Sequence, residues 1–213
     1  MDNLQNAAVF FKYISENEFT FVLGYKGNQR EIIISASEDH FPHLIGLDKL
    51  IDIKNSIFRT QGKKEVLARI LSGDLGLKLI EKSSFFINDE FHQSIENRIS
   101  FFSLLRPMFT NGNVLGEANF VFLKKNAYSS INANYLFRLQ IKSDAQVYYL
   151  NLFLKKDESP SASSNHYIPI SFFPRKDNKY EIKQQSLTVL FKLRKKEDET
   201  EVLYTRNGFK PTL

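Results

Sequence analysis

The chain has 213 residues, of which 42% are hydrophobic, a formal net charge of +5 and no cysteine. This length suits one domain of above-average size, and the hydrophobic fraction is ordinary for a globular protein with a core. The absence of cysteine excludes disulfides, thiolate zinc sites and a cysteine nucleophile, and is compatible with the cytoplasm. The modest positive excess fits nucleic-acid binding but does not require it.

The N-terminus has neither the basic start nor the long apolar core of a secretory signal. No apolar run in the sequence approaches the roughly 18 residues that are needed to span a bilayer. We therefore expect a soluble cytoplasmic protein with no membrane partner.

Helices and one hairpin are predicted in the first half of the chain. Apolar residues at helical spacing predict a helix over residues 3–15. A hairpin is expected at residues 19–35, because a Gly-Asn turn at Gly27 separates two β-rich runs. Further helices are expected at 35–46, where Ser35 and Glu38 have capping-box spacing, at 63–71, and at 88–105, which is the longest and contains His92.

The helix over 88–105 is expected to end at Pro107, because proline cannot continue a helical hydrogen-bond ladder. The segments that follow alternate between apolar and polar side chains. Such alternation predicts strands with one apolar and one polar face. The predicted strands are 114–123, 136–142, 147–155, 167–173, 187–194 and 202–205.

Because helices precede strands, the sequence predicts an α+β fold. The expected layout is an N-terminal hairpin with helices, followed by a C-terminal antiparallel sheet. We divide a single domain, 1–213, into a helix-rich part with the hairpin (1–110), the sheet (111–206) and a loose tail (207–213).

The polar face of the predicted sheet is the first candidate site. Its strands carry cations and aromatic rings but no Asp or Glu. Single-stranded RNA needs this combination, because rings stack on bases and cations bind phosphates. A solvated sheet face without any function is the alternative. The RNA-binding candidates are Arg138, Lys142, Tyr149, Asn151, Tyr167, Tyr180, Gln185, Lys192 and Arg194.

The segment over residues 167–175 is the second candidate. Its prolines, Pro169 and Pro174, suit an edge strand or a bent strand. Ser171 can hydrogen-bond a phosphate, and Arg175 can hold one through two parallel hydrogen bonds. An edge strand without chemistry is the alternative.

Histidines provide the third candidate. His40 and His43 lie one turn apart, but no convincing third ligand accompanies them, so no metal site is expected. Histidine titrates near neutrality, which makes His43 a candidate general acid or base, with His166 as its competitor. A purely structural role is the alternative for each.

Several catalytic motifs are absent from the sequence. It contains no Gly-rich phosphate loop, nucleophile elbow, HExxH pair or dense acidic cluster. A nuclease with this sequence is therefore expected to work without a metal, and no cofactor is expected.

Two segments resemble a known family. His43-Leu44-Ile45-Gly46-Leu47 after the hairpin, and residues 152–155 followed by 167–173 and a glutamine, are similar to a nuclease family of phages and mobile elements. It is the barnase–EndoU–colicin–RelE-like (BECR fold) group, in its fourth phage-associated branch. The resemblance covers roughly residues 17–195.

The resemblance implies a barnase- or RelE-like fold, with helices first and then an antiparallel sheet whose open face holds the active site. It also implies a metal-independent ribonuclease, because members of the wider group are typically such enzymes, and many of them act as toxins against tRNA or mRNA. The positions that match the family are His43, Lys155, Ser171 and Gln185.

We therefore predict a toxin-like endoribonuclease in which the RNA 2′-hydroxyl attacks the adjacent phosphorus. His43 or His166 would move a proton, and Ser171 would orient the phosphate. Developing charge on the phosphate oxygens would be stabilised by cations. The cations assigned to this role are Arg138, Lys155 and Arg175.

The expected partners are RNA, either tRNA or mRNA, and an antitoxin or immunity protein. The main alternative is a non-catalytic RNA- or protein-binding module of a phage or mobile element that uses the basic sheet face. A neutralising antitoxin is a third alternative, which the positive net charge disfavours.

Overall fold

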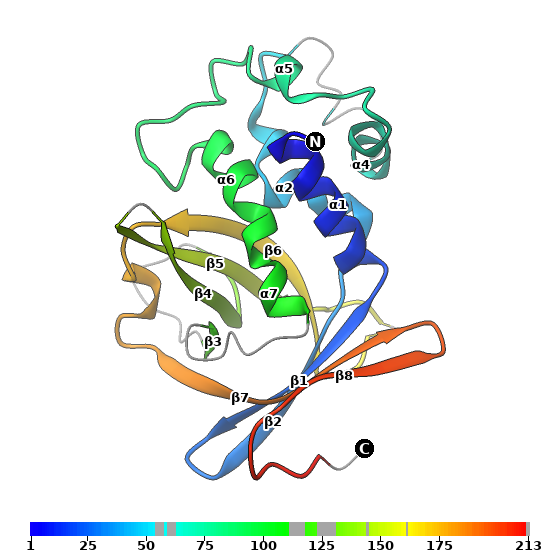
Figure 1. Ribbon diagram of the computed structural model, residues 1–213, viewed down its shortest axis with the longest axis vertical. Coiled ribbons are helices and arrows are strands. Elements are labelled where there is room, and N and C mark those ends of the chain that lie inside the picture. The colour runs from blue at the N-terminus through cyan, green and yellow to red at the C-terminus, as the bar shows by residue number, and fades with distance from the viewer. Residues whose placement is uncertain are drawn as a thin grey trace.

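The computed structural model describes residues 1–53, 58, 63–110, 118–122, 131–143, 145–160 and 162–211. In this part of the chain, helices gather on one side of a strongly curved sheet (Figure 1). The helices are α1 (Asn3–Ser15), α2 (Phe41–Leu44), α4 (Lys63–Ser72), α5 (Leu77–Ile80), α6 (Ile95–Phe102) and α7 (Arg106–Phe109). The 3-10 turns within the described residues are η1 (Glu38–His40), η2 (Leu47–Lys49), η3 (Ser103–Leu105) and η4 (Lys179–Glu181).

Strands make up most of the second half of the chain, and two more come from its beginning. The first two form the N-terminal hairpin. The strands are β1 (Glu18–Tyr25), β2 (Asn28–Ile34), β3 (Ala118–Phe122), β4 (Tyr135–Ser143), β5 (Gln146–Lys156), β6 (His166–Arg175), β7 (Gln185–Lys196) and β8 (Glu199–Thr205).

Local sequence signals place several elements correctly. The predicted helix at 3–15 is confirmed as α1, where the Asp2 carboxylate accepts a hydrogen bond from the Gln5 N–H at 2.8 Å and caps the helix. The helix at 63–71 is confirmed as α4. The hairpin is confirmed as β1 and β2, and both residues of its turn, Lys26 and Gly27, have positive φ.

The helix predicted at 35–46 begins later than expected, at η1. Ser35 directly follows β2 and still bonds to the sheet, because its N–H donates to the Tyr167 carbonyl. The helical path ends as predicted at Gly46, whose φ of 82° is accessible to glycine at little cost.

The prediction of one long helix over 88–105 is wrong at both ends. Residues 88–94 form turns, and α6 begins only at Ile95, with Ser94 as its cap. Pro107 lies in the first turn of α7, where its missing N–H costs nothing, so it opens a helix rather than ending one. His92 therefore lies in a turn before α6 and not on a helix.

The sheet differs from the predicted C-terminal antiparallel sheet in two ways. The N-terminal hairpin belongs to it, because β1 pairs with β7. The pairing of β2 with β6 is parallel, and it involves only Ile33 with His166 and Ile34 with Tyr167. The sheet is therefore mixed, and the pairings from β1 through β2, β6, β5, β4, β3 and β7 close into a ring, with β8 added through β7.

Phenylalanine rings join the helices to the apolar side of this sheet. Phe102 of α6 packs edge-on against Phe172 of β6, with ring centroids 5.2 Å apart. Phe109 of α7 contacts Phe19 of β1 and Phe137 of β4 in the same way, at 5.0 and 5.6 Å. Each edge-on contact adds about 0.5–1.5 kcal/mol beyond the burial of the rings. The helical layer therefore holds the apolar face of the sheet and leaves the other face for polar side chains.

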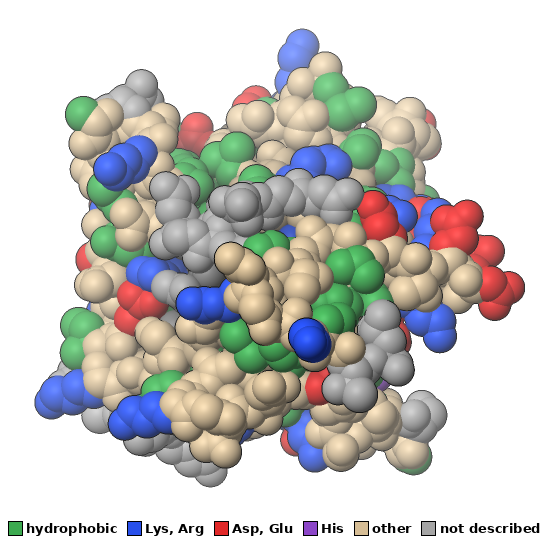
Figure 2. Space-filling model, turned by 60° about the horizontal axis from the view of Figure 1, so that its bottom comes forward, with side chains coloured by type: hydrophobic (Ala, Val, Ile, Leu, Met, Phe, Trp, Pro, Cys, Tyr) green, Lys and Arg blue, Asp and Glu red, His purple; other side chains and the backbone are tan. Residues whose placement is uncertain are grey.

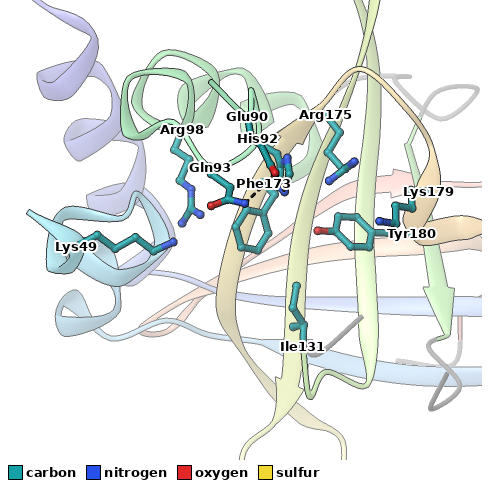
Figure 3. Close-up of a pocket in the computed structure, with 10 residues that line it drawn as sticks. All are labelled: Lys49, Glu90, His92, Gln93, Arg98, Ile131, Phe173, Arg175, Lys179 and Tyr180. Carbon is teal, nitrogen blue, oxygen red and sulfur yellow. Dashed lines mark hydrogen bonds and ion pairs between the residues drawn. The ribbon is translucent and has the colours of Figure 1, made fainter. Parts of the chain in front are cut away.

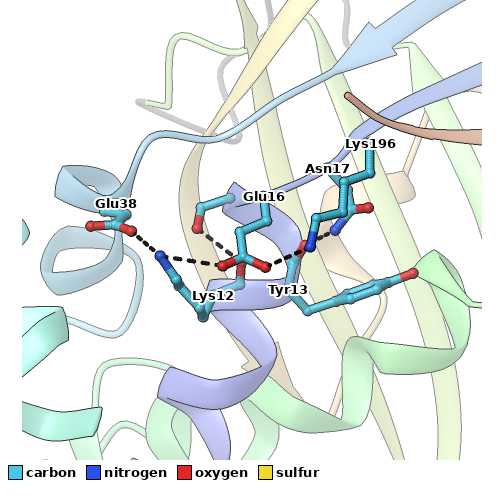
Figure 4. A network of polar contacts seen from close by, with 7 residues as sticks. Lys12, Tyr13, Glu16, Asn17, Glu38 and Lys196 are labelled. Atoms are coloured by element: carbon cyan, nitrogen blue, oxygen red, sulfur yellow. Dashed lines mark hydrogen bonds and ion pairs between the residues drawn. The ribbon is translucent and has the colours of Figure 1, made fainter. Parts of the chain in front are cut away.

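A network of charged side chains connects the end of α1 to its neighbours (Figure 4). The Lys12 ammonium lies 2.5 Å from the Glu38 carboxylate of η1 and 3.4 Å from Glu16. Glu16 also pairs with Lys196 of β7 at 3.3 Å, and the hydrogen bond from Lys196 is the main cause that lowers the pKa of Glu16. These groups are exposed enough for solvent to weaken the ion pairs. We therefore expect the pairs to orient α1 and its neighbours more than to stabilise the fold.

On the face that Figure 2 shows, Lys and Arg side chains are scattered among other types instead of forming one continuous patch.

The tail that was expected to be loose contacts the sheet, because the Phe209 ring lies 6.3 Å from that of Phe191. Residues 212–213 of the tail lie outside the described residues. None of the helices in the described ranges is long and apolar enough to cross a membrane.

Lys192 of β7 faces the interior, where its ammonium donates to the carbonyls of Met108 and Thr110 at 3.3 and 2.6 Å. Burial lowers its pKa to about 8, so the unfolded chain binds more protons between about pH 8 and the ordinary lysine value of 10.5. The free energy of unfolding should therefore rise across this window relative to Lys192→Met, by at most about 1.4 kcal/mol per pH unit.

Urea denaturation of both proteins from pH 7 to 10 measures this difference. Lys195→Met, an exposed position on the same strand, is the control and should follow the wild type. Parallel pH profiles for the wild type and Lys192→Met would contradict the burial of a charged amine.

Candidate active site

The candidate site lies along one side of β6. This strand pairs with β5 over most of its length, whereas β2 pairs with it only at His166 and Tyr167. Helices α2 and α6 approach the remainder of β6. The junction between the helical layer and the sheet therefore lies at this strand.

A cavity of about 400 Å³ opens at the junction (Figure 3). Its positive side chains come from both layers, and two aromatic rings lie between them. Among the described residues the walls are Lys49, Glu90, His92, Gln93, Arg98, Ile131, Phe173, Arg175, Lys179 and Tyr180.

Arg98 of α6 forms the helical wall of the cavity. Its side chain belongs to the buried stripe of the helix and is only 2% exposed. The guanidinium carbon lies 4.2 Å from the centre of the Phe173 ring, and neither Nε nor Nη2 has a hydrogen-bond partner. Desolvation lowers the pKa of Arg98 to about 10, so it is charged at neutral pH. A buried cation with unused donors is suited to binding an anion.

Lys49 of η2 points toward the same space as Arg98 (Figure 3). Desolvation, together with the charge of Arg98, lowers the pKa of Lys49. Two cations that repel each other across a partly dry cavity are stabilised when an anion lies between them.

His92 lies on the other side of the Phe173 ring, in the turn before α6. Desolvation, together with the charge of Arg175, lowers the pKa of His92 below its ordinary value of 6.5. Its imidazole is therefore neutral at pH 7 and can accept a proton. The Glu90 carboxylate is 3.5 Å from Nε2 and would stabilise the imidazolium.

Arg175 and Tyr180 form the sheet wall. Arg175, at the end of β6, donates from Nε and Nη2 to the two carboxylate oxygens of Asp177 at 2.7 and 2.8 Å. This pair raises the pKa of Arg175. The Tyr180 ring lies 5.2 Å from the guanidinium of Arg175 and 4.9 Å from the Phe153 ring.

His43 of α2 is not among the described walls of the cavity. Its Nδ1 is 2.7 Å from the Asp48 carboxylate, so Nε2 is the ring nitrogen that remains for proton exchange. Desolvation raises the pKa of Asp48, but the hydrogen bond and charge of His43, helped by Lys49 and Arg98, outweigh it and lower the pKa. His43 is thus connected through Asp48 to the cations of the cavity.

The polar sheet face begins beside the cavity. In register across three strands, Arg138 of β4 pairs with Asn151 of β5, and Asn151 pairs with Phe173 of β6. The Asn151 amide donates to the carbonyls of Tyr149 and Phe173, which fixes its orientation. Arg138 lies 5.4 Å from the Tyr149 ring. The structure therefore brings Arg138, Tyr149, Asn151, Arg175 and Tyr180 of the predicted set together.

Three predicted catalytic residues lie away from the described walls of the cavity. Ser171 pairs with Phe153 on the same sheet face, two residues before Phe173. Lys155 lies further along β5 and pairs with Glu158 at 3.5 Å. His166, at the parallel β2–β6 junction, is 2.8 Å from the Ser35 hydroxyl.

The other predicted RNA-binding residues are dispersed. Lys142 is exposed at the end of β4, and Gln185 begins β7 opposite Phe122. Burial raises the pKa of Tyr167 to about 12, and Arg194 pairs with Glu201 at 2.7 Å. The buried Lys192 donates to backbone carbonyls, as described above.

Sequence reasoning missed Lys49, His92 and Arg98 as site residues. One signal for Arg98 was present, because it falls at a core-facing position of the stripe formed by Ile95, Ile99 and Phe102. A charged side chain in such a stripe is rare unless it has a partner or a ligand. His92 and Lys49 lie in short turns and gave no comparable signal. Among the described residues, no group of three or more metal-ligating side chains occurs.

Comparison with known proteins shows the family of the chain. The sequence matches the phage-Barnase-EndoU-ColicinE5/D-RelE like nuclease4 family over residues 3–207. The chain therefore belongs to this nuclease family, which confirms the resemblance found in the sequence. No curated protein matches the chain. No solved structure matches it either.

Replacing Arg98 by methionine tests the anion site. Removing a buried, unpaired charge should leave the free energy of unfolding unchanged or raise it, although a buried residue is altered. Inorganic phosphate should stabilise the wild type by about 1.4 kcal/mol at ten times its Kd, and it should not stabilise Arg98→Met.

Thermal denaturation with and without phosphate measures both effects. Arg106→Met is the matched control, because Arg106 also lies over a phenylalanine ring, that of Phe10 at 5.2 Å, but is exposed. Equal stabilisation of Arg98→Met and the wild type by phosphate would place the anion elsewhere.

Proposed function

We propose that this nuclease is an endoribonuclease and that the cavity at Arg98 holds the phosphodiester to be cleaved. The observation that supports this most is the buried guanidinium with unused donors beside the Phe173 ring. An RNA phosphate would supply the missing acceptors, and an adjacent base would stack on the Phe173 or Tyr180 ring.

The proposed reaction is attack by the 2′-hydroxyl on the adjacent phosphorus. His92, neutral at pH 7, takes the 2′-hydroxyl proton while the new P–O2′ bond forms and the P–O5′ bond breaks. The products are a 2′,3′-cyclic phosphate and a 5′-hydroxyl. His43, held by Asp48, supplies the proton to the leaving oxygen.

Charge that develops on the phosphate oxygens is stabilised by the cations around the cavity. Arg98 and Lys49 approach from the helical layer, and Arg175 approaches from β6 (Figure 3). Such preorganised donors contribute several kcal/mol to lowering the barrier. In this proposal Ser171 and Lys155 contact neighbouring parts of the RNA on the sheet face and take no part in the chemical step.

We include in the proposal a metal-independent reaction with tRNA or mRNA as the substrate. We also propose a toxin-like role, restrained by an antitoxin or immunity protein, with the family resemblance as its support.

Incubation with total tRNA in the presence of EDTA tests this function. The wild type should cleave RNA and leave 2′,3′-cyclic phosphate ends, whereas 2′-O-methyl RNA should stay intact because it lacks the attacking hydroxyl. His92→Gln should lower the rate by about 10²–10⁴-fold, the usual contribution of a general base. His40→Gln is the matched histidine control and should keep the rate.

Three outcomes would contradict the proposal. A wild type that binds but never cleaves RNA would support a non-catalytic binding module. Cleavage of 2′-O-methyl RNA would exclude attack by the 2′-hydroxyl. Loss of activity in His166→Gln but not in His92→Gln would move proton transfer to the β2–β6 junction.

A further inference from the structure

The connection between β6 and β7, residues 176–184, contributes acidic side chains that form ion pairs with two arginines of the sheet face. We refer to it as the β6–β7 strap. Asp177 accepts two parallel hydrogen bonds from Arg175. Glu181 accepts one from Nη1 of Arg138 at 2.5 Å, and both side chains of this second pair are largely buried. One short segment thus supplies the carboxylate for each arginine.

The strap is also held to the sheet by an aromatic ring. Tyr180, between the two carboxylates in sequence, packs edge-on against Phe153, with centroids 4.9 Å apart. Lys179 of the strap lines the cavity beside Tyr180 (Figure 3). The strap therefore extends from the cavity at Arg98 to the sheet face at Arg138.

The contacts of the strap are of the type that arginine makes with phosphate. Arg binds carboxylates and phosphates with the same fork of N–H donors. Burial of the ionised Glu181 carboxylate is unfavourable. Desolvation raises its pKa, although the charge and the hydrogen bond of Arg138 oppose this. A phosphate that brings its own neighbouring base can compete for the same donors.

The ring next to Arg138 is suited to that base. The Tyr149 ring of β5 lies 5.4 Å from the Arg138 guanidinium of β4. Asn151 of β5, directly opposite Arg138, is fixed by two backbone carbonyls. An arginine and an aromatic ring side by side form the minimal unit that binds one nucleotide of a single strand.

We propose that Arg138 and Tyr149 form a second nucleotide subsite next to the Arg98 cavity, and that Glu181 of the β6–β7 strap occupies it until an RNA phosphate replaces the carboxylate. The proposal rests on RNA as the ligand of the cavity. It adds a binding position outside the cleaved phosphate and a built-in competitor for that position.

The test measures binding of a fluorescent single-stranded 2′-O-methyl RNA by anisotropy, so the result does not depend on cleavage. Glu181→Gln should bind about tenfold more tightly than the wild type, the change expected when one charge-assisted competing contact is lost. Glu16→Gln is the control, because it removes the same charge from a carboxylate that pairs with Lys12 and Lys196 instead. The gain should disappear in the double variant Glu181→Gln with Arg138→Gln.

Asp177→Asn provides a second variant, because the Asp177 side chain is 56% exposed and its replacement does not threaten the fold. It should also bind more tightly, by releasing Arg175. If Glu181→Gln and Asp177→Asn bind the RNA no more tightly than Glu16→Gln, the proposed competition by the strap is wrong, even if the wild type cleaves RNA. Tighter binding by both variants would support the strap even if no protein in the series cleaves RNA.

Discussion

The burial of the Arg98 guanidinium is the constraint on which the site depends. Removing a cation from water costs several kcal/mol unless other groups compensate. Here the face of the Phe173 ring and the nearby charge of Asp48 compensate in part, while Nε and Nη2 keep unused donors. The protein therefore keeps, where the helices meet the sheet, a buried charge that does not favour folding. In the proposed function, the phosphate of the RNA compensates for that cost.

The fold creates this place because only two residue pairs close the ring of strands between β2 and β6. The parallel pairing with β2 ends after two residues, which leaves the rest of that strand to α2 and α6. The phenylalanine contacts between Phe102 and Phe172 fix α6 over β6. Phe173, the next residue, points to the opposite face and receives Arg98. Because side chains alternate along a strand, Phe172 points into the core and Phe173 lines the cavity.

Much of the fold could be predicted because its signals are local. The alternation of apolar and polar residues predicted β4, β5, β6 and β7, and the helical spacing of apolar residues predicted α1 and α4. The ring closure and the parallel pair depend on contacts between residues far apart in the chain, which no local pattern encodes. The failure at 88–105 has a specific cause, because Phe91 continues the apolar pattern but contacts the rings of Phe101 and Tyr148 from a turn.

The candidate site was predicted only in part, for similar reasons. Arg175 was predicted because its forked donors suit a phosphate, and Tyr180 was predicted as an RNA-binding ring; both line the cavity. Alternation also assigned Lys192 to the polar face, whereas the structure uses its ammonium to bind carbonyls at the end of α7. The helical half of the site, Arg98 with Lys49, depends on how α6 crosses β6, and a single sequence does not contain that geometry.

The most direct measurement is the ¹⁵N NMR signal of the Arg98 side-chain Nε during titration with a 3′-mononucleotide. Binding of the phosphate in the cavity should shift this signal and slow the exchange of its proton, while Arg106 Nε stays unchanged. A nucleotide that shifts other signals but leaves Arg98 unaffected, or that does not bind at all, would contradict a phosphate site at Arg98.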